Sequence, residues 1–429
     1  MLSKSGLSKK KNIPAAILMT WSAAAGAEFD FHPSVSAQRE WNSNVFYVEN
    51  HADAAAQHGG DPALRDTITR YVAGIDTGFH WGAGERFHIF GEGRRENYDH
   101  FNLLDHDEYL AGIGYDWQFG DRSSGKLQYT QEYRMASLIE REDFDKHMEM
   151  ERKAEADFYI KRTADWRYEI ALRARDLHSP LGVTTAEVRG YPTPVALPEE
   201  PNFGMREEAV SLGVHYQGTA HIDSGVSTEF LVGKYRYVPS VTDVTTTPPT
   251  VGTTNPPSYL QTTVQGFAIY EIKDFSKATG RLGVTFRGDD NTGYTQETDL
   301  TGLLSYWRAF TSKTSADVDL QRSVGSYAAG SAGMVNTGAG AHFNWETPFA
   351  LRLRGGYDWT HSSFQGTDVV DPSLRNRRDT IQTLSAAGQF DFLRYFSLEP
   401  SYQRQTRDSN KPGKDYNANI VMVMLRAHY

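Results

Sequence analysis

The 429-residue chain contains no cysteine, so its fold uses no disulfide bond and no thiolate metal site. Its mean hydropathy is only −0.55. The sequence also lacks any apolar run as long as the roughly 20 residues that a membrane-spanning helix needs. These two features exclude a bundle of membrane helices.

Sequence motifs of the common enzyme classes are missing as well. The chain has no P-loop, no G-x-S-x-G, no H-E-x-x-H and no complete G-x-G-x-x-G. Its 14 histidines are scattered without the spacing of metal ligands. Asp105, Asp107 and Glu108, or Asp289 and Asp290, leave a Ca²⁺ site in an outer loop open, although clustered acids in loops are usually only solvated. We therefore expect no enzyme active site, no cofactor and no metal site.

Polar and apolar residues instead alternate at every second position, in one segment after another. In the segment 107–119, Tyr109, Ile113 and Trp117 share one face, and Gly112, Asp116 and Gln118 share the other. A period of two is typical of strands with one face in an apolar phase and one in a polar phase. A charged side chain facing the bilayer midplane costs roughly 2–4 kcal/mol. The charged faces are therefore predicted to line a lumen, and the apolar faces to contact lipid.

The alternation predicts about 18 strands, and the short and long connections between them predict how the strands are arranged. Tight links alternate with longer ones, as in barrels with short periplasmic turns and long extracellular loops. We therefore expect an all-β fold, a transmembrane antiparallel up-and-down β-barrel with both chain ends on the periplasmic side. The predicted strands are 34–42, 68–81, 86–98, 107–119, 124–137, 146–161, 165–176, 205–217, 224–238, 259–272, 278–288, 295–310, 314–324, 333–346, 349–361, 380–393, 396–406 and 416–429.

The first 27 residues are typical of an export signal. Four lysines precede an apolar run from Ile13 to Ala25, and Ala25-Gly26-Ala27 fits the small-x-small site of signal peptidase. A membrane anchor is the alternative, but the apolar run is too short for a spanning helix. We expect cleavage before Glu28, which leaves residues 28–429 as one barrel domain. Loss of the four lysines changes the formal net charge from −10 to −14, so we expect no nucleic-acid partner.

Two kinds of segment leave alternatives open. Residues 138–162 are rich in strong helix formers and are compatible with an amphipathic helix or plug, although alternation favours a strand from about residue 146. The Thr/Pro tract 240–258 carries too little apolar surface to order itself, and the stretch 177–201 holds five prolines. We expect solvated outer loops there; a loop folding inward to constrict the pore is the alternative.

Alternation also assigns individual residues. The candidate lumen lining, which would contact the cargo, consists of Lys126, Glu132, Arg134, Glu151, Lys153, Glu155, Asp157, Arg167, Glu169, Arg173, Arg175, Asp317, Asp319, Arg352, Arg354 and Asp358. Aromatic residues near strand ends suit a membrane-interface girdle, namely Trp81, Trp117, Phe119, Trp166, Tyr306, Trp345, Phe392 and Tyr429. Arg152 falls on the lipid face, which a position near the lipid headgroups would explain.

Two stretches resemble known outer-membrane barrels. Residues Phe31–Phe46, FHPSVSAQREWNSNVF, resemble the opening of the beta-barrel porin 2 group, a first strand followed by an x-N-x-N-v-F turn. The stretch Tyr98–Tyr109, running into Trp117–Gly120, resembles EpsL-type barrels associated with exopolysaccharide export. The likeness covers mainly residues 28–137. It implies a polysaccharide conduit in a Gram-negative outer membrane, with outer-membrane lipid, a polysaccharide chain and periplasmic export components as partners.

Three functions are therefore weighed. The first is a passive channel for exopolysaccharide export, and the second is a general or small-solute diffusion porin with the same polar lumen. The third is an outer-membrane lipid-modifying enzyme, which would need a serine and a histidine on adjacent outward strand faces. The sequence points to no such pair.

Overall fold

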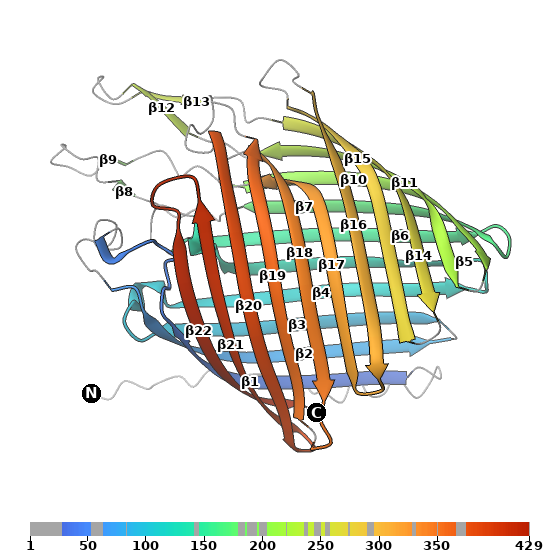
Figure 1. Ribbon diagram of the computed structural model, residues 1–429, viewed down its shortest axis with the longest axis horizontal. Helices are drawn as coiled ribbons and strands as arrows, with labels where there is room; N and C mark the ends of the chain where they lie inside the picture. The colour runs from blue at the N-terminus through green and yellow to red at the C-terminus, as the bar shows by residue number, and fades with distance from the viewer. Residues whose placement is uncertain are drawn as a thin grey trace, which may run out of the picture.

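The computed structural model shows a single closed β-barrel (Figure 1). It describes residues 28–52, 63–82, 84–140, 146–178, 185–186, 195–196, 204–219, 221–235, 239–243, 250–253, 258–272, 275–289, 296–327, 332–349, 351–365 and 375–428. The predicted export signal and Tyr429 lie outside these residues. No helix in the described part of the chain is long and apolar enough to cross a membrane.

Eighteen strands form the wall. They are β1 (Glu28–Asn42), β2 (Asp66–Trp81), β3 (Glu85–Tyr98), β4 (His106–Phe119), β5 (Ser123–Met135), β6 (Met148–Lys161), β7 (Trp166–His178), β10 (Gly204–Thr219), β11 (Ile222–Tyr235), β14 (Ser258–Ile272), β15 (Ser276–Asp289), β16 (Gln296–Thr311), β17 (Thr314–Tyr327), β18 (Ala332–Glu346), β19 (Leu351–Gln365), β20 (Arg375–Leu393), β21 (Phe396–Ser409) and β22 (Tyr416–His428).

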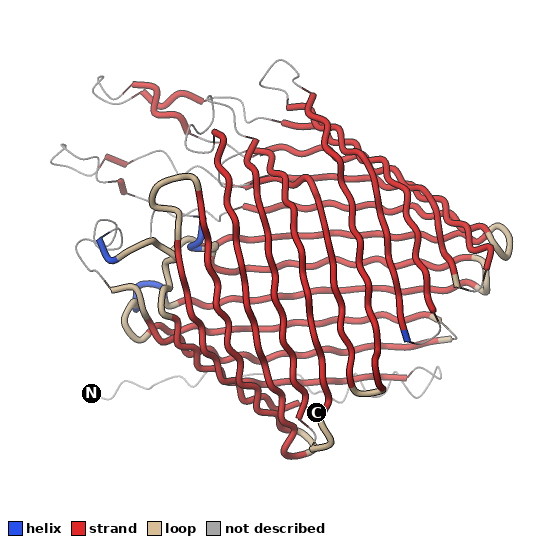
Figure 2. The backbone as a smooth tube through the Cα atoms, in the orientation of Figure 1, coloured by secondary structure: helices blue, strands red, loops and turns tan. Residues whose placement is uncertain are grey.

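Each wall strand pairs antiparallel with its neighbours in the chain, and β1 also pairs with β22, from Ser34 opposite His428 to Asn42 opposite Ile420. The sheet therefore has no free first or last strand, which removes the edges that hydrocarbon does not tolerate. Figure 2 shows tight turns at one end of the barrel and longer connections at the other. The predicted fold class, strand number and antiparallel order are confirmed.

Most strand limits agree with the alternation pattern to within three residues, but β1 begins earlier, β19 ends at Gln365 rather than at residue 361, and β20 begins at Arg375 rather than at residue 380. The first strand begins at Glu28 rather than at residue 34, because β2 offers partners from Asp66 to His80 along its length. The ambiguous segment divides into a short 3-10 turn, η2 (Leu138–Glu140), and a strand from Met148. Cross-strand pairing with β5 and β7 overrides the helix propensity of its glutamates.

Some long connections contain structure that the sequence did not predict. Short strands β8 (Thr185–Ala186) and β9 (Val195–Ala196) pair with each other, as do β12 (Pro239–Asp243) and β13 (Thr250–Thr253). The expectation that the tract 240–258 would not order itself was therefore wrong for residues 240–243 and 250–253. A second 3-10 turn, η1 (Asn102–Leu104), lies between β3 and β4.

One long-range contact identifies the inner face. Arg407 of β21 donates a hydrogen bond of 3.2 Å to the carbonyl of Ile139. Ile139 lies between β5 and β6, so that β22 and β1–β4 separate the two residues along the wall. Only side chains on the concave side reach across the mouth in this way. Because antiparallel partners share a face, the register then places every other residue inside or outside.

Candidate functional site

The inner face forms the candidate site, a lumen lined by ionic groups. The register places every predicted lumen residue on the same face as Arg407, and large apolar side chains such as Ile113, Leu172 and Leu320 are exposed on the opposite face. The strand register therefore places these residues together on one face of the wall, and their role in lining a passage and binding cargo stays a prediction.

Glu151 of β6 is the centre of the densest ionic group. Its side chain is only 3% exposed, and it lies 2.5 Å from Arg175 Nε, 3.0 Å from Lys153 Nζ and 3.6 Å from Arg134 Nη2. Arg175 also reaches Glu207 on β10 at 3.3 Å. Strands β5, β6, β7 and β10 supply these residues, because their register places them at one height. Paired charges satisfy the carboxylate that burial would otherwise destabilise.

A second group lies near the periplasmic ends of β7, β10 and β11. The guanidinium of Arg167 is 3.0 Å from both Asp223 Oδ2 and His215 Nδ1, and His215 Nε2 is 2.7 Å from Glu169. His215 Nδ1 also lies 3.3 Å from Asp223 Oδ1, so the imidazole is held between Arg167, Asp223 and Glu169. Arg167, His215 and Asp223 line a cavity of about 190 Å³ together with the β4–β5 and β6–β7 turns. Higher on the same wall, Arg173 pairs with Glu229 at 3.2 Å.

The opposite wall carries fewer charges. His342 of β18 lies between two carboxylates, with Nδ1 2.8 Å from Asp317 and Nε2 3.2 Å from Asp358, and Asp319 completes an acidic group. Gly340 leaves room for this group, because a Cβ there would lie 2.5 Å from Asp319 Oδ1.

Further residues of this wall are neutral or paired. Arg352 pairs with Asp391, and Arg354 donates to Gln389 at 3.1 Å. Hydroxyl and amide groups occupy the stretch between the charged regions. Their hydrogen bonds include Thr263 to Thr285 at 2.9 Å and Gln265 to Ser227 at 3.1 Å. The lumen therefore offers both signs of charge and neutral hydrogen-bonding groups.

Loops fold together at the extracellular mouth, a feature that the sequence did not predict. Eight buried apolar side chains from the connections β1–β2, β3–β4 and β5–β6 and from adjoining strand ends form a mouth cluster. It consists of Val45, Phe46, Val48, Ile68, Tyr98, Phe101, Leu104 and Leu138. The side chain of Asn44 shapes the first loop, because its amide donates to Val48 O at 2.7 Å and its oxygen accepts from Val48 N at 3.2 Å. Burial raises the pKa of the neighbouring Tyr47 hydroxyl above its ordinary value.

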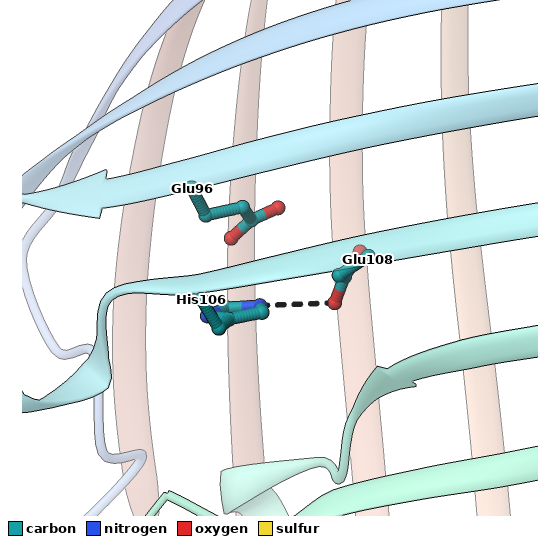
Figure 3. A group of neighbouring side chains, drawn as sticks. All are labelled: Glu96, His106 and Glu108. Carbon is teal, nitrogen blue, oxygen red and sulfur yellow. Dashed lines mark hydrogen bonds and ion pairs between the residues drawn. The ribbon is translucent and has the colours of Figure 1, made fainter. Parts of the chain in front are cut away.

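An ionic network lies directly below the mouth cluster. Arg70 pairs with Glu40 and, at 2.5 Å, with Glu96, while His106 Nε2 is 3.0 Å from Glu108 (Figure 3). The atoms of Glu96, His106 and Glu108 are close enough to hold a metal ion. However, Arg70 and Arg94 already neutralise the two carboxylates, and His106 Nδ1 contacts Leu104 O at 2.6 Å. The group therefore fits a structural ion network better than a metal centre.

Neighbouring residues on a strand point to opposite sides of the wall, which divides the acidic stretch near residue 105. Asp107 faces outward and pairs with Arg95 at 3.1 Å, whereas Glu108 faces the lumen and pairs with Arg94. Asp105 accepts a hydrogen bond from the backbone of Tyr98 at 2.7 Å. These residues do not converge on one point, so the alternative of a Ca²⁺ site there was wrong.

The interface aromatics mostly lie exposed on the outer face near the tight turns. Exposed members are Trp81, Phe119, Trp166, Tyr306, Trp345 and Phe392. Trp117 differs, because it is only 8% exposed and its ring packs over Gly125 and beside Phe158. On the outer face near the opposite end, Arg152 lies in register with Asp176 of β7. A headgroup location for Arg152 is compatible with this height but stays a prediction.

Comparison with known proteins gives one family match. Residues 282–429, about a third of the chain, match the family described as "Putative beta-barrel porin 2". The match covers the last strands, whereas the resemblance in the sequence lay in residues 28–137. The chain is an outer-membrane β-barrel. Its last third is similar to that porin family.

Solved structures with a similar chain path come from other outer-membrane barrels. Pseudomonas aeruginosa OpdK, solved with vanillate, shares 10% identity at a TM-score of 0.47, covering 93% of this chain and 99% of that chain. Pseudomonas aeruginosa OccK5 (OpdH) shares 11% at 0.44, covering 93% and 98%. The siderophore receptor PirA of Acinetobacter baumannii shares 7% at 0.49, covering 93% and 80%. No curated protein matches the sequence of this outer-membrane barrel.

Proposed function

We propose that the barrel is a porin through which small hydrophilic solutes diffuse across the outer membrane. The observation that carries this proposal is the largely polar lining, with ion pairs on two opposite walls and hydroxyl and amide groups between them. A barrel of this strand number is wide enough for an aqueous passage unless loops fill it. Groups of both signs and neutral groups suit polar solutes without a strong preference for one charge.

The extracellular mouth supports small solutes rather than a polymer. The mouth cluster buries Phe46 to 1% exposure, and the hydrogen bond from Arg407 to Ile139 O joins the β5–β6 connection to β21. Both features reduce the open cross-section at this end. Export of an exopolysaccharide rests only on the resemblance of residues 28–137, and no contact in the described residues favours it.

Liposome swelling tests the proposal. Purified barrel, verified as folded by its heat-modifiable mobility in gels, is reconstituted into liposomes and exposed to sugars of increasing size. We expect rapid swelling with monosaccharides and slower swelling as the sugar grows. Folded protein that produces no swelling with any sugar contradicts the proposal. Block of single-channel current by the cognate polymer, with no monosaccharide flux, favours the export conduit instead.

A further inference from the structure

Two neighbouring strands of the wall are not paired along their full length at the extracellular end. Pairing between β16 and β17 stops at Gly302 opposite Arg322. Beyond this point Gln296–Thr301 remain paired with β15, and Ser323–Tyr327 remain paired with β18, but not with each other. Figure 1 shows the upper end of β17 curving away from β16. We call this break the β16–β17 seam.

The ends of β17 and β18 lie inside the wall. By alternation Ser326 faces outward, as Val318 and Leu320 do lower on the same strand. Its hydroxyl nevertheless donates to Tyr259 Oη at 2.7 Å and accepts from Arg287 Nη1 at 3.1 Å. Both partners belong to the inner face of β14 and β15. An outward residue can touch inward residues of another strand only if its own strand has moved into the lumen.

Arg287 holds these strand ends in place. Its side chain is only 3% exposed, and its guanidinium lies 3.8 Å from the centre of the Tyr259 ring. The same group donates to Gly325 O at 3.3 Å and to Tyr235 Oη at 3.1 Å. Tyr259 in turn contacts Glu207. One buried cation therefore fixes the end of β17 against three strands of the wall.

A glycine permits the close approach on β18. A Cβ at Gly333 would lie 3.3 Å from Arg287 Nε and 2.9 Å from Gln365 Oε1. Across the seam, Arg322 Nε donates to Leu300 O at 3.0 Å, and its Nη2 reaches Asp299 at 3.2 Å. The side chain of Arg322 thus donates to the Leu300 carbonyl of β16. In a fully paired ladder, a backbone N–H of β17 would donate to this carbonyl instead.

We propose that the inward ends of β17 and β18 form the constriction that sets the size limit of the channel, with Arg287 as the residue that positions them. This inference rests on the proposed porin function. An unpaired strand edge at a membrane surface is costly. The natural alternative is therefore a state in which β16 and β17 pair along their full length, with Thr301 opposite Ser323. We call it the zipped state. Zipping would withdraw the strand ends from the lumen and widen it.

An engineered disulfide tests the constriction, and the cysteine-free chain makes the experiment clean. The double variant Thr301→Cys/Ser323→Cys continues the register beyond Gly302 and locks the zipped state when oxidised. The matched control Leu304→Cys/Leu320→Cys bridges a pair that is already in register. In planar bilayers, we expect oxidation to raise single-channel conductance about two-fold or more in the test pair, because conductance follows the cross-section of the narrowest point. Reduction should reverse the change, and the control should show none.

Two results overturn the constriction. One is an oxidised test pair with unaltered conductance. The other is a test pair that fails to oxidise while the control pair does, because the seam then has no zipped state. The proposed function fails differently, through a wild-type barrel that conducts nothing and swells no liposome.

Arg287 is tested separately by Arg287→Gln, with Arg287→Lys as the conservative variant. Arg281→Gln is the matched control, because it removes a positive charge from the same face of the same strand. We expect Arg287→Gln alone to admit larger sugars in the swelling assay, and Arg287→Lys to restore part of the limit. An unchanged sugar limit in a folded Arg287→Gln barrel removes the positioning role.

Discussion

Arg175 Nε lies 2.5 Å from a carboxylate oxygen of Glu151, a side chain that the lumen wall almost completely buries. Arg175 itself is about one-third exposed, so water screens part of the attraction. Removing one partner of a buried pair leaves the other uncompensated, which makes the pair a sensitive point of the wall.

The variant Glu151→Gln is expected to lower the free energy of unfolding by about 2 kcal/mol, because three cations lose their shared carboxylate. Urea unfolding in detergent micelles, followed by tryptophan fluorescence, measures the change. The matched control is Glu208→Gln on the outer face, where the carboxylate is 57% exposed and pairs with Arg206. That control should cost no more than about 0.5 kcal/mol. Equal losses would contradict a special role for burial at Glu151.

Ion selectivity should respond to the inner charges and not to the outer ones. Replacing Lys153 and Arg173 together by Gln removes two lumen cations, so the permeability ratio of K⁺ to Cl⁻ is expected to rise about two-fold. Reversal potentials in a salt gradient give this ratio. Arg152→Gln removes one positive charge from the lipid-facing side of β6 and should leave the ratio unaltered. A shift of equal size from Arg152→Gln would refute the assignment of faces.

Phe46→Ala should loosen the mouth cluster. Truncating a fully buried phenylalanine costs about 3–5 kcal/mol of packing, and here the loss falls on loops rather than on the strand ladder. We expect noisier and larger single-channel currents, with thermal unfolding of the barrel nearly unchanged. Phe349→Ala is the comparison, because Phe349 is 82% exposed at a tight turn. Quiet wild-type-like currents from Phe46→Ala would show that the cluster does not limit the mouth.

Gly125→Ala should displace Trp117. A Cβ at residue 125 would lie 2.2 Å from the indole and 2.3 Å from Asp157 O, so overpacking of about 1–3 kcal/mol is expected. Differential scanning calorimetry in detergent measures the loss. Gly93→Ala is the control, since no heavy atom lies within 4 Å of a Cβ there. The same melting temperature for both variants would contradict the packing of Trp117 over this glycine.

Much of the wall was predictable because a period of two is a local property. Residues such as Glu151 and Ile113 could be assigned to opposite faces from their neighbours alone, and the structure keeps these assignments. The candidate lumen residues follow from the same rule. Their pairing was not predictable, because Arg175 meets Glu207 only through the register between β7 and β10.

The features that narrow the channel could not be predicted from the sequence, because they depend on contacts between segments that are distant in the chain. Alternation places Ser326 on the outer face of the wall. The hydrogen bond from Arg287 nevertheless holds Ser326 on the lumen side. Similarly, Asn44 and Phe46 read only as a turn motif, and their burial depends on Leu104 and Leu138 from other loops. Gly333 offered a weak signal, since a glycine in a strand often marks a close backbone approach.

The closure between β1 and β22 dictates how such a molecule can assemble. Ser34 must meet His428, so nearly the whole polypeptide has to be positioned before the cylinder can shut. Until that moment both terminal strands present unsatisfied backbone groups, which template pairing with foreign chains. The slowest and most vulnerable stage of biogenesis should therefore be the final one, when a nearly complete sheet still lacks its last row of hydrogen bonds.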